Sequence, residues 1–424
     1  MEQLLNNREP QIGQPHQNDL HKLQPNKAKA LKSLKLIIFS AIIMLNSLNI
    51  IKATNTHLSE FADISILTCS PGDELYSTFG HTGIRVKDPV TDLDIVFNYG
   101  TFNFQTHNFY LKFARGLLNY QLVVEKYDQF IMDYIADDRA VFEQVLSLSF
   151  DEKNVLFEAL LDNAKPENRE YQYHFFFDNC ATRVRDIIDN NIEGNLFFDR
   201  PKHDPKMTFR HAIAEYLKVK PWTKLGLDLI LGRPTDERMD EYTVQFLPDY
   251  LMEQFSTSRR VYGSSKIIMA TNQLLKTHRN PKKHYAPPVL ILSLAAIIVF
   301  LITRYDFKRK KSAKLIDIIL FGIPGLLGLL ILFLWFFTNH TVTGPNWHII
   351  WASPLLIVFF FWTKYNDFYK YFTAFLFSCQ LFCLAFFALF IQHFPLALIP
   401  VWIMIMVRIF LKFSEVRHLD KLKR

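Results

Sequence analysis

The sequence is poor in cysteine, with 4 in 424 residues. It also has no glycine-rich phosphate-binding loop and no cluster of His, Cys, Asp and Glu at metal-ligand spacing. We therefore predict no metal and no cofactor. Cys379 and Cys383 lie four positions apart in an apolar segment, where cysteine usually serves as a small packing residue. For the remaining pair, Cys69 and Cys180, two states stay open: a disulfide in an oxidising compartment, or free thiols.

The formal net charge of +7 is unevenly distributed along the chain. Residues 1–35 carry a net +3, residues 304–314 carry +5 and residues 408–424 carry +4, so the rest of the chain is net negative. A nucleic-acid-binding protein would carry its basic residues on the soluble domain. Here they flank apolar segments instead, which is typical of the cytoplasmic side of a membrane protein. We predict a lipid bilayer as partner and no nucleic acid.

The order of polar and apolar segments predicts five regions. Residues 1–35 form a basic, disordered cytoplasmic segment, and residues 36–53 a signal peptide or an uncleaved N-terminal anchor. Residues 54–286 form a soluble domain, residues 287–411 a transmembrane bundle of about five helices, and residues 412–424 a basic cytoplasmic tail. The expected spans are 287–303, 315–337, 349–362, 372–392 and 395–411, of which the third is the shortest in its core.

The Lys and Arg distribution also predicts orientation. If residues 304–314 and the C-terminal tail are cytoplasmic, the Lys-free and Arg-free loop at 338–348 and the soluble domain lie on the other side. We therefore expect a multi-pass membrane protein with its soluble domain outside the cytoplasm.

The soluble domain has the pattern of an α+β fold. Residues 64–69 read as a strand, and residues 82–86 and 93–99 as a hairpin. Residues 126–163 have helical spacing, residues 171–177 read as a strand or extended segment, and a helix follows from Cys180.

Cys180 is the best candidate nucleophile. Asp178 or Asn179 is a suitable N-cap, which places Cys180 in the first helical turn. The helix dipole there favours a thiolate, so we expect a lowered thiol pKa. His81, between two glycines at a strand start, is the best-placed general base, and Asn98 on the adjoining strand would orient its ring. The alternative is a purely structural role, in which Cys180 is only a small buried side chain.

Other residues leave alternatives open. The competing histidines are His107, His174, His203 and His211. Arg183, one turn after Cys180, is either a surface charge or a phosphate ligand. The block Phe175–Phe177 is most simply a buried strand.

Several longer motifs resemble one family, the Lnb-type lipoprotein N-acyltransferases. In the soluble domain these are LTCSPG at 67–72, FGHTGIRV at 79–86, NYGTF at 98–102, PENREY at 166–171 and FFDNCATR at 176–183. In the apolar part they are TNH at 338–340 and NWHIIW at 346–351. The soluble domain also resembles circularly permuted NlpC/P60 (papain-like) proteins, in which the histidine strand precedes the cysteine helix.

The resemblance implies an acyltransferase. Cys180 would take an acyl chain from a phospholipid as a thioester, and the N-terminal amine of a diacylated lipoprotein would receive it, with His81 as base. Asn179, Tyr99 and Arg183 would contact substrate.

In the membrane part, the outward loop with His340 and Trp347 would help to position lipid, or would serve only as an interfacial anchor.

Two other functions remain open from the sequence. One is a membrane-anchored cell-wall peptidase or amidase of the NlpC/P60 type, for which a large bundle is unnecessary. The other is a non-catalytic membrane scaffold.

Overall fold

The computed structural model describes residues 57–102, 105–199, 207–261, 265–278, 285–309, 313–361, 366–389 and 392–423. The predicted disordered segment 1–35, the predicted signal or anchor 36–53 and the candidate histidine His203 lie outside these ranges. Residues from Thr56 onward form one compact unit.

The N-terminal part of the described chain is built on an antiparallel sheet in the order β6-β4-β3-β2-β1-β5-β9. Its strands are β1 (Asp63–Cys69), β2 (His81–Asp88), β3 (Leu93–Thr101), β4 (Asn119–Lys126), β5 (Val141–Leu146), β6 (Glu170–Gln172) and β9 (Ile268–Leu275). A small second sheet pairs β7 (Leu196–Phe197) with β8 (Arg259–Arg260). The predicted strand at 64–69 and the predicted hairpin of β2 and β3 are confirmed.

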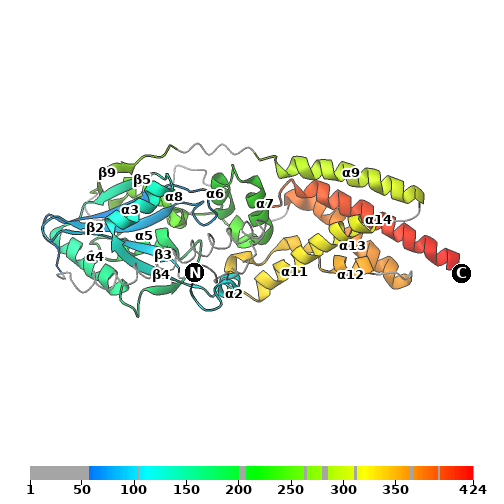
Figure 1. Cartoon of the computed structure of the whole chain (residues 1–424), viewed down its shortest axis with the longest axis horizontal. Coiled ribbons are helices and arrows are strands. Elements are labelled where there is room, and N and C mark those ends of the chain that lie inside the picture. The colour runs from blue at the N-terminus through cyan, green and yellow to red at the C-terminus, as the bar shows by residue number, and fades with distance from the viewer. Residues whose placement is uncertain are drawn as a thin grey trace, which may run out of the picture. The chain divides into compact units, whose positions relative to one another are not determined.

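The same part of the chain contains helices, some of which pack on the sheet. They are α2 (Phe109–Ala114), α3 (Tyr127–Ala136), α4 (Phe150–Asn163), α5 (Cys180–Asn190), α6 (Phe209–Tyr216), α7 (Pro221–Ile230) and α8 (Pro248–Thr257), with short turns η1 (Arg233–Asp236) and η2 (Thr243–Phe246). Helix α5 packs on β2 and β3, and α3 packs on β3 and β4 (Figure 1). The start of α5 is thereby brought to the strand that begins with His81.

Two sequence predictions in this domain were wrong. The segment 126–163 is not one helical region, because Asp138 adopts a left-handed φ of 48° after α3 and β5 follows. The segment 171–177 is a strand only to Gln172. Backbone hydrogen bonds between His174 and Asp178 then close a tight turn, so the Phe175–Phe177 block lies in a turn and not in a buried strand.

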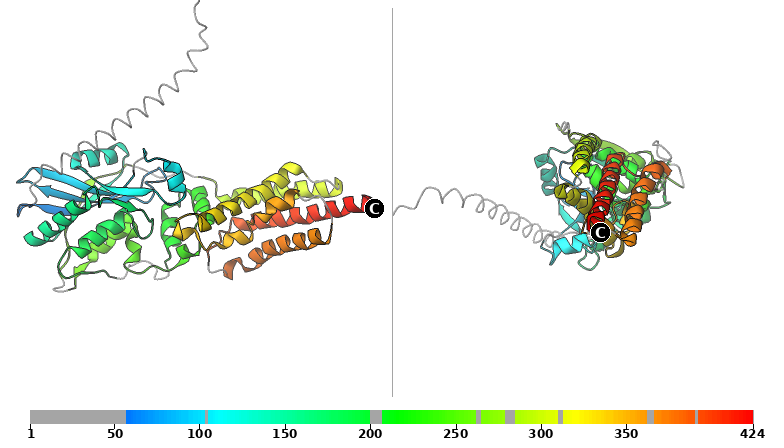
Figure 2. Two further views of the ribbon diagram at one scale, coloured as in Figure 1. Left: turned by 90° about the horizontal axis from the view of Figure 1, so that it is seen from below. Right: turned by 90° about the vertical axis from the view of Figure 1, so that its right-hand side faces the viewer.

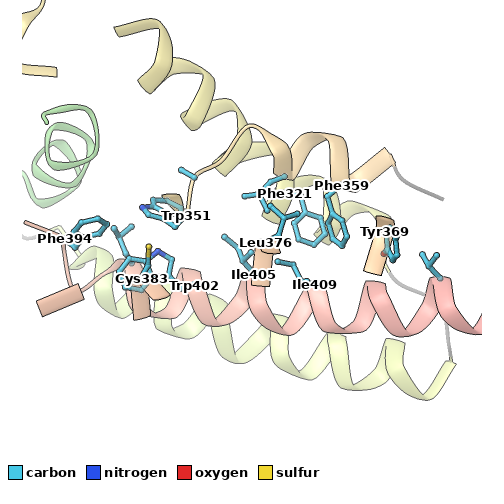
Figure 3. Packing of buried hydrophobic residues seen from close by; sticks show 14 residues of the cluster. Phe321, Trp351, Phe359, Tyr369, Leu376, Cys383, Phe394, Trp402, Ile405 and Ile409 are labelled. Atoms are coloured by element: carbon cyan, nitrogen blue, oxygen red, sulfur yellow. The ribbon is translucent and has the colours of Figure 1, made fainter. Parts of the chain in front are cut away.

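The C-terminal part is helical. Its elements are α9 (Pro288–Arg309), α10 (Lys314–Asp317), η3 (Ile318–Gly322), α11 (Ile323–Phe336), η4 (Thr341–Thr343), η5 (Trp347–Ile350), α12 (Leu355–Phe361), α13 (Asp367–Phe386), η6 (Phe387–Leu389) and α14 (Leu398–Lys423). The long helices run beside one another (Figure 2), with α14 against both α9 and α13. Buried aromatic and aliphatic side chains, including Phe321, Trp351, Tyr369 and Trp402, form the bundle core (Figure 3).

Among the described residues, three helices are long and apolar enough to cross a membrane: Pro288–Arg309, Lys314–Phe336 and Asp367–Leu389. The predicted third span coincides with a shorter apolar helix, Trp347–Phe359. The predicted fifth span lies in α14, which continues through the basic segment expected to be a tail. Helix α14 carries the fully buried Arg408 within its apolar stretch.

Arg408 holds three segments of the bundle together. Its Nη1 donates to Asp306 at 2.8 Å and its Nη2 to Asp317 at 2.5 Å. All three side chains are at most 8% exposed. A cation in apolar surroundings is retained only when such partners compensate it.

Replacing this cation should destabilise the bundle. Arg408→Ala leaves Asp306 and Asp317 buried without their partner, so we expect the unfolding free energy to fall by about 3–5 kcal/mol. Arg417→Ala, at an exposed position of the same helix, is the matched control and should change it by less than about 0.5 kcal/mol. Chemical unfolding in detergent measures both, and equal effects would contradict the account.

Candidate active site

The first turn of α5 presents Cys180. Asn179 caps the helix, as predicted: its Oδ1 accepts the N–H of Ala181 at 2.9 Å and that of Thr182 at 3.0 Å. Its Nδ2 donates to the carbonyl oxygens of Phe175 at 2.7 Å and Phe246 at 2.8 Å. One buried amide therefore ties the preceding turn, η2 and α5 together. This fixes where the thiol sits.

The Cys180 thiol is neutral at physiological pH, contrary to our prediction of a lowered pKa. Burial raises its pKa to about 11, and the backbone N–H groups of Thr82 and Ala181 together with the Arg139 charge lower it only in part. Helix-terminus stabilisation of a thiolate is modest, whereas loss of water around an anion is costly. The sequence pattern indicates the helix terminus, but it does not show how deeply the thiol is buried.

His81 begins β2 and is the cross-strand partner of Cys69. Burial lowers its pKa to about 4, so the imidazole is neutral and able to accept a proton. Its Nε2 lies 2.6 Å from Asn98 Oδ1, as expected for an orienting residue. Asn98 Nδ2 donates to Glu125 Oε1 at 2.8 Å. Because the amide donates to Glu125, its oxygen must face His81, so Nε2 carries the proton and Nδ1 is the basic nitrogen.

Glu125 was missed by the sequence reasoning. It lies on β4 diagonally opposite Asn98 on the same face, since Val96 pairs with Glu125 and Asn98 with Val123. Glu125 is 9% exposed, and burial raises its pKa to about 7. The available signal was an acidic side chain directly after the apolar run Leu122–Val124 in a strand-like segment.

A cavity of about 490 Å³ joins these groups. It is lined by His81, Asn98, Asn179, Cys180 and His340, all predicted site residues. Its aromatic walls comprise Tyr76, Phe79, Phe102, Phe113, Tyr120, Tyr134, Tyr173, Phe175 and Phe246. The described lining contains no Asp or Glu. The cavity thus combines a thiol, an imidazole and mostly apolar walls.

Three other predicted residues do not line this cavity. Tyr99 is buried and follows Asn98 in the strand, so its side chain points to the opposite face. Arg183 makes a two-fold ion pair with Asp178, at 2.5 and 2.8 Å. Trp347 is 41% exposed on η5.

The competing histidines that the structure describes, His107, His174 and His211, do not line the cavity either. His107 and His211 are exposed. His174 Nε2 lies 2.6 Å from the Thr341 hydroxyl. Among the described histidines other than His340, His81 alone shares the cavity with Cys180.

Cys69 and Cys180 are both free thiols, which favours the second of the two states left open by the sequence. Burial raises the pKa of Cys69 to about 12, and Tyr134 is its side-chain hydrogen-bond partner. Cys69 does not line the cavity. Cys383 is a packing residue of the bundle core, as predicted for the apolar cysteines.

Family models match both parts of the chain. The Lnb N-terminal periplasmic domain matches residues 53–214, and the Lnb transmembrane domain matches residues 280–418. The chain belongs to the Lnb-type family.

Membership in the Lnb-type family confirms the resemblance that the sequence motifs carried. It also makes the chain a membrane protein with a periplasmic domain, in agreement with its apolar helices. The matched range 53–214 includes His81, Asn98 and Cys180. No curated protein and no solved structure shows significant similarity to the chain.

The reactivity of Cys180 should depend on pH as a buried thiol requires. Alkylation by iodoacetamide needs the thiolate, so its rate should rise through pH 8–10 toward the thiol pKa of about 11. Mass spectrometry of the modified peptide from the detergent-solubilised chain gives the rate. The exposed fraction of the side chain is small, so the absolute rate should also be low. A rate already constant between pH 6 and 8 would mean a preformed thiolate and would contradict the assignment.

Proposed function

We propose that this Lnb-type protein is a lipoprotein N-acyltransferase that works through a thioester on Cys180. The single observation that carries the proposal is the shared cavity of Cys180, His81 and Asn98, in a chain of this family. The acyl donor would be a phospholipid and the acceptor the N-terminal amine of a diacylglyceryl-cysteine lipoprotein. The arrangement needs no cofactor.

In the first half-reaction, Cys180 Sγ attacks an ester carbonyl of the phospholipid while His81 Nδ1 takes the thiol proton. The tetrahedral intermediate collapses with cleavage of the bond between the carbonyl carbon and the glycerol oxygen. The imidazolium returns the proton to that oxygen. The products are a lysophospholipid and an acyl-Cys180 thioester, and His81 is neutral again.

In the second half-reaction, the lipoprotein amine attacks the thioester carbonyl and His81 takes one amine proton. The carbon–sulfur bond breaks, an amide forms, and the departing sulfur recovers a proton from His81. Asn98 Oδ1 holds the ring by accepting a hydrogen bond from Nε2–H, and the imidazole keeps this proton throughout.

The low pKa of His81 and the high pKa of the Cys180 thiol oppose a separate thiolate–imidazolium pair, so the proton must move as the thiol attacks. Neither group is charged at rest, so apolar lipid meets an uncharged site. Charge develops only when the thiol proton moves to the imidazole as the new bond forms. Aromatic walls that keep water away favour aminolysis of the thioester over its hydrolysis.

The cavity borders the part of the chain that follows a candidate membrane span. His340, in its lining, lies in the loop after α11, and its Nε2 is 3.1 Å from the carbonyl oxygen of Phe113. The Asn339 N–H donates to the carbonyl oxygen of Arg115 at 2.9 Å. The neighbouring helix α2 exposes Tyr110 and Leu111, at 81% and 57%. Exposed apolar side chains beside a span support delivery of lipid from the outer leaflet.

We further propose a circularly permuted papain-like fold for the periplasmic domain and a multi-pass arrangement in the inner membrane. The order of the His81 strand before the Cys180 helix supports the first. The basic residues at 304–314 and 408–424, on the far side of the spans from residues 338–348, support the second.

Loss of the nucleophile or base should abolish lipoprotein N-acylation. In a bacterial strain that depends on this chain for N-acylation, Cys180→Ser and His81→Ala should each lower the triacylated fraction at least about 100-fold, because general-base catalysis alone contributes that much. Mass spectrometry of lipoprotein N-terminal peptides measures the fraction.

Matched controls are Cys379→Ser, in the bundle, and His211→Ala, on the exposed surface, which should stay within about twofold of the native chain. Normal triacylation with Cys180→Ser would refute the transferase mechanism. That result would favour a cell-wall hydrolase or a non-catalytic membrane scaffold instead.

Glu125 should act through Asn98 and not on substrate. Glu125→Gln keeps an acceptor for the Asn98 amide but cannot ionise, so the change in activity near the Glu125 pKa of about 7 should disappear while the maximal rate falls less than about threefold. Glu125→Leu removes the acceptor, so the Asn98 side-chain amide can rotate away from its orienting position. This change should lower kcat about 10- to 100-fold. Rates measured from pH 5 to 9 test this. Identical losses for both variants would assign Glu125 a purely structural role.

A further inference from the structure

Arg139 is a buried cation in the wall of the catalytic cavity. It lies between α3 and β5 and is 6% exposed. Its Nε donates to the Ser70 carbonyl oxygen at 2.7 Å, and its guanidinium carbon lies 4.7 Å from the centre of the Tyr134 ring. These contacts fix the group in place. Its Nη2, however, is buried without a hydrogen-bond partner among the described residues.

Arg139 differs from the other buried arginines of the described chain. Those arginines are Arg85, Arg185, Arg210 and Arg408, and each lies within hydrogen-bond distance of at least one carboxylate. Arg139 has no such carboxylate among the described residues, and the described cavity lining contributes none. A buried charge without a counter-ion is costly, so the site is built to be completed by an anion.

We propose that Arg139 binds the phosphate of the donor phospholipid. This deepens the proposed function and rests on it. Cys180 and Arg139 line the same cavity, and in a glycerophospholipid the ester carbonyl and the phosphate are only a few bonds apart. A guanidinium matches a phosphodiester by paired, charge-assisted hydrogen bonds. The permanent phosphate charge would compensate Arg139 throughout the bound state, which a short-lived oxyanion would not.

The structure favours Arg139 over the arginine that the sequence suggested. The Arg183 guanidinium is already paired with Asp178, and it lies over the Tyr171 ring at 4.0 Å. Arg183 is absent from the cavity lining, whereas Arg139 is part of it. The phosphate ligand is therefore assigned to a residue far from the Cys180 motif in sequence.

The test compares two donors with the same acyl chains. The full-length chain in mixed micelles acylates a diacylglyceryl-cysteine peptide, with either dioleoylphosphatidylglycerol or dioleoylglycerol as donor. The native chain should favour the phosphate-bearing donor by at least about 10-fold in kcat/KM. Arg139→Gln should remove that preference by lowering kcat/KM for the phospholipid about 10- to 100-fold, mainly through KM, with little change for dioleoylglycerol.

Control variants distinguish phosphate binding by Arg139 from a role of Arg139 in folding or in the acyl-transfer step. Arg139→Lys keeps the charge and should retain part of the preference, and the exposed Arg259→Gln should retain all of it. Equal loss for both donors in Arg139→Gln would show that Arg139 serves the thiol or the oxyanion and would overturn the proposal. So would equal use of both donors by the native chain, a result that needs no variant. If the native chain acylates the peptide from neither donor, the proposed function itself fails.

Discussion

The exclusion of water from one thiol and one imidazole is the constraint on which the site depends. Cys180 and His81 both lose hydration at the same end of the sheet, which raises the pKa of the thiol to about 11 and lowers that of the imidazole to about 4. Each shift disfavours the charged form. Both groups are therefore neutral at rest, and the proposed mechanism depends on the transfer of one proton from the thiol to the imidazole. In the proposed reaction on lipids, no ion would then have to be desolvated when an acyl chain enters the cavity.

The surrounding structure fixes the positions of Cys180 and His81. Asn179 uses its whole amide to fix the start of α5, and Asn98 is oriented by Glu125 so that its oxygen faces the imidazole. Both asparagines have their polar atoms satisfied by buried partners, which leaves little freedom to rotate. The aromatic walls then exclude water, and the loop with His340 connects the cavity to the membrane part. The candidate site and the membrane part are thus joined through this loop.

The sequence predicted the parts of this site that local patterns determine. An asparagine directly before a helix marks a cap, and a glycine-bracketed histidine at a strand start marks β2, so Asn179, Cys180 and His81 were found. Alternation within a short run also predicted the β2–β3 hairpin that carries Asn98. What failed depended on non-local burial. The thiol pKa was predicted in the wrong direction, because a helix terminus is visible in the sequence and desolvation is not.

Glu125 and Arg139 could not be found from sequence for the same reason. Glu125 matters through its hydrogen bond to Asn98, which lies on a strand that pairs with β4 only in the folded chain. Arg139 matters through its place in the cavity wall. Arg183 looked suitable because it follows Cys180 by one turn, yet a local partner, Asp178, neutralises it. Residue chemistry predicted the three residues that share the cavity, whereas the ionisation of the thiol required the structure.

The most direct test of the central claim is the intact mass of the full-length chain after incubation with phospholipid in the absence of any lipoprotein acceptor. Our account predicts one added acyl chain per protein, attached to Cys180, released by neutral hydroxylamine as a thioester is, and absent when His81 is alanine. An unmodified native chain, or an adduct that remains when Cys180 is replaced, would contradict it.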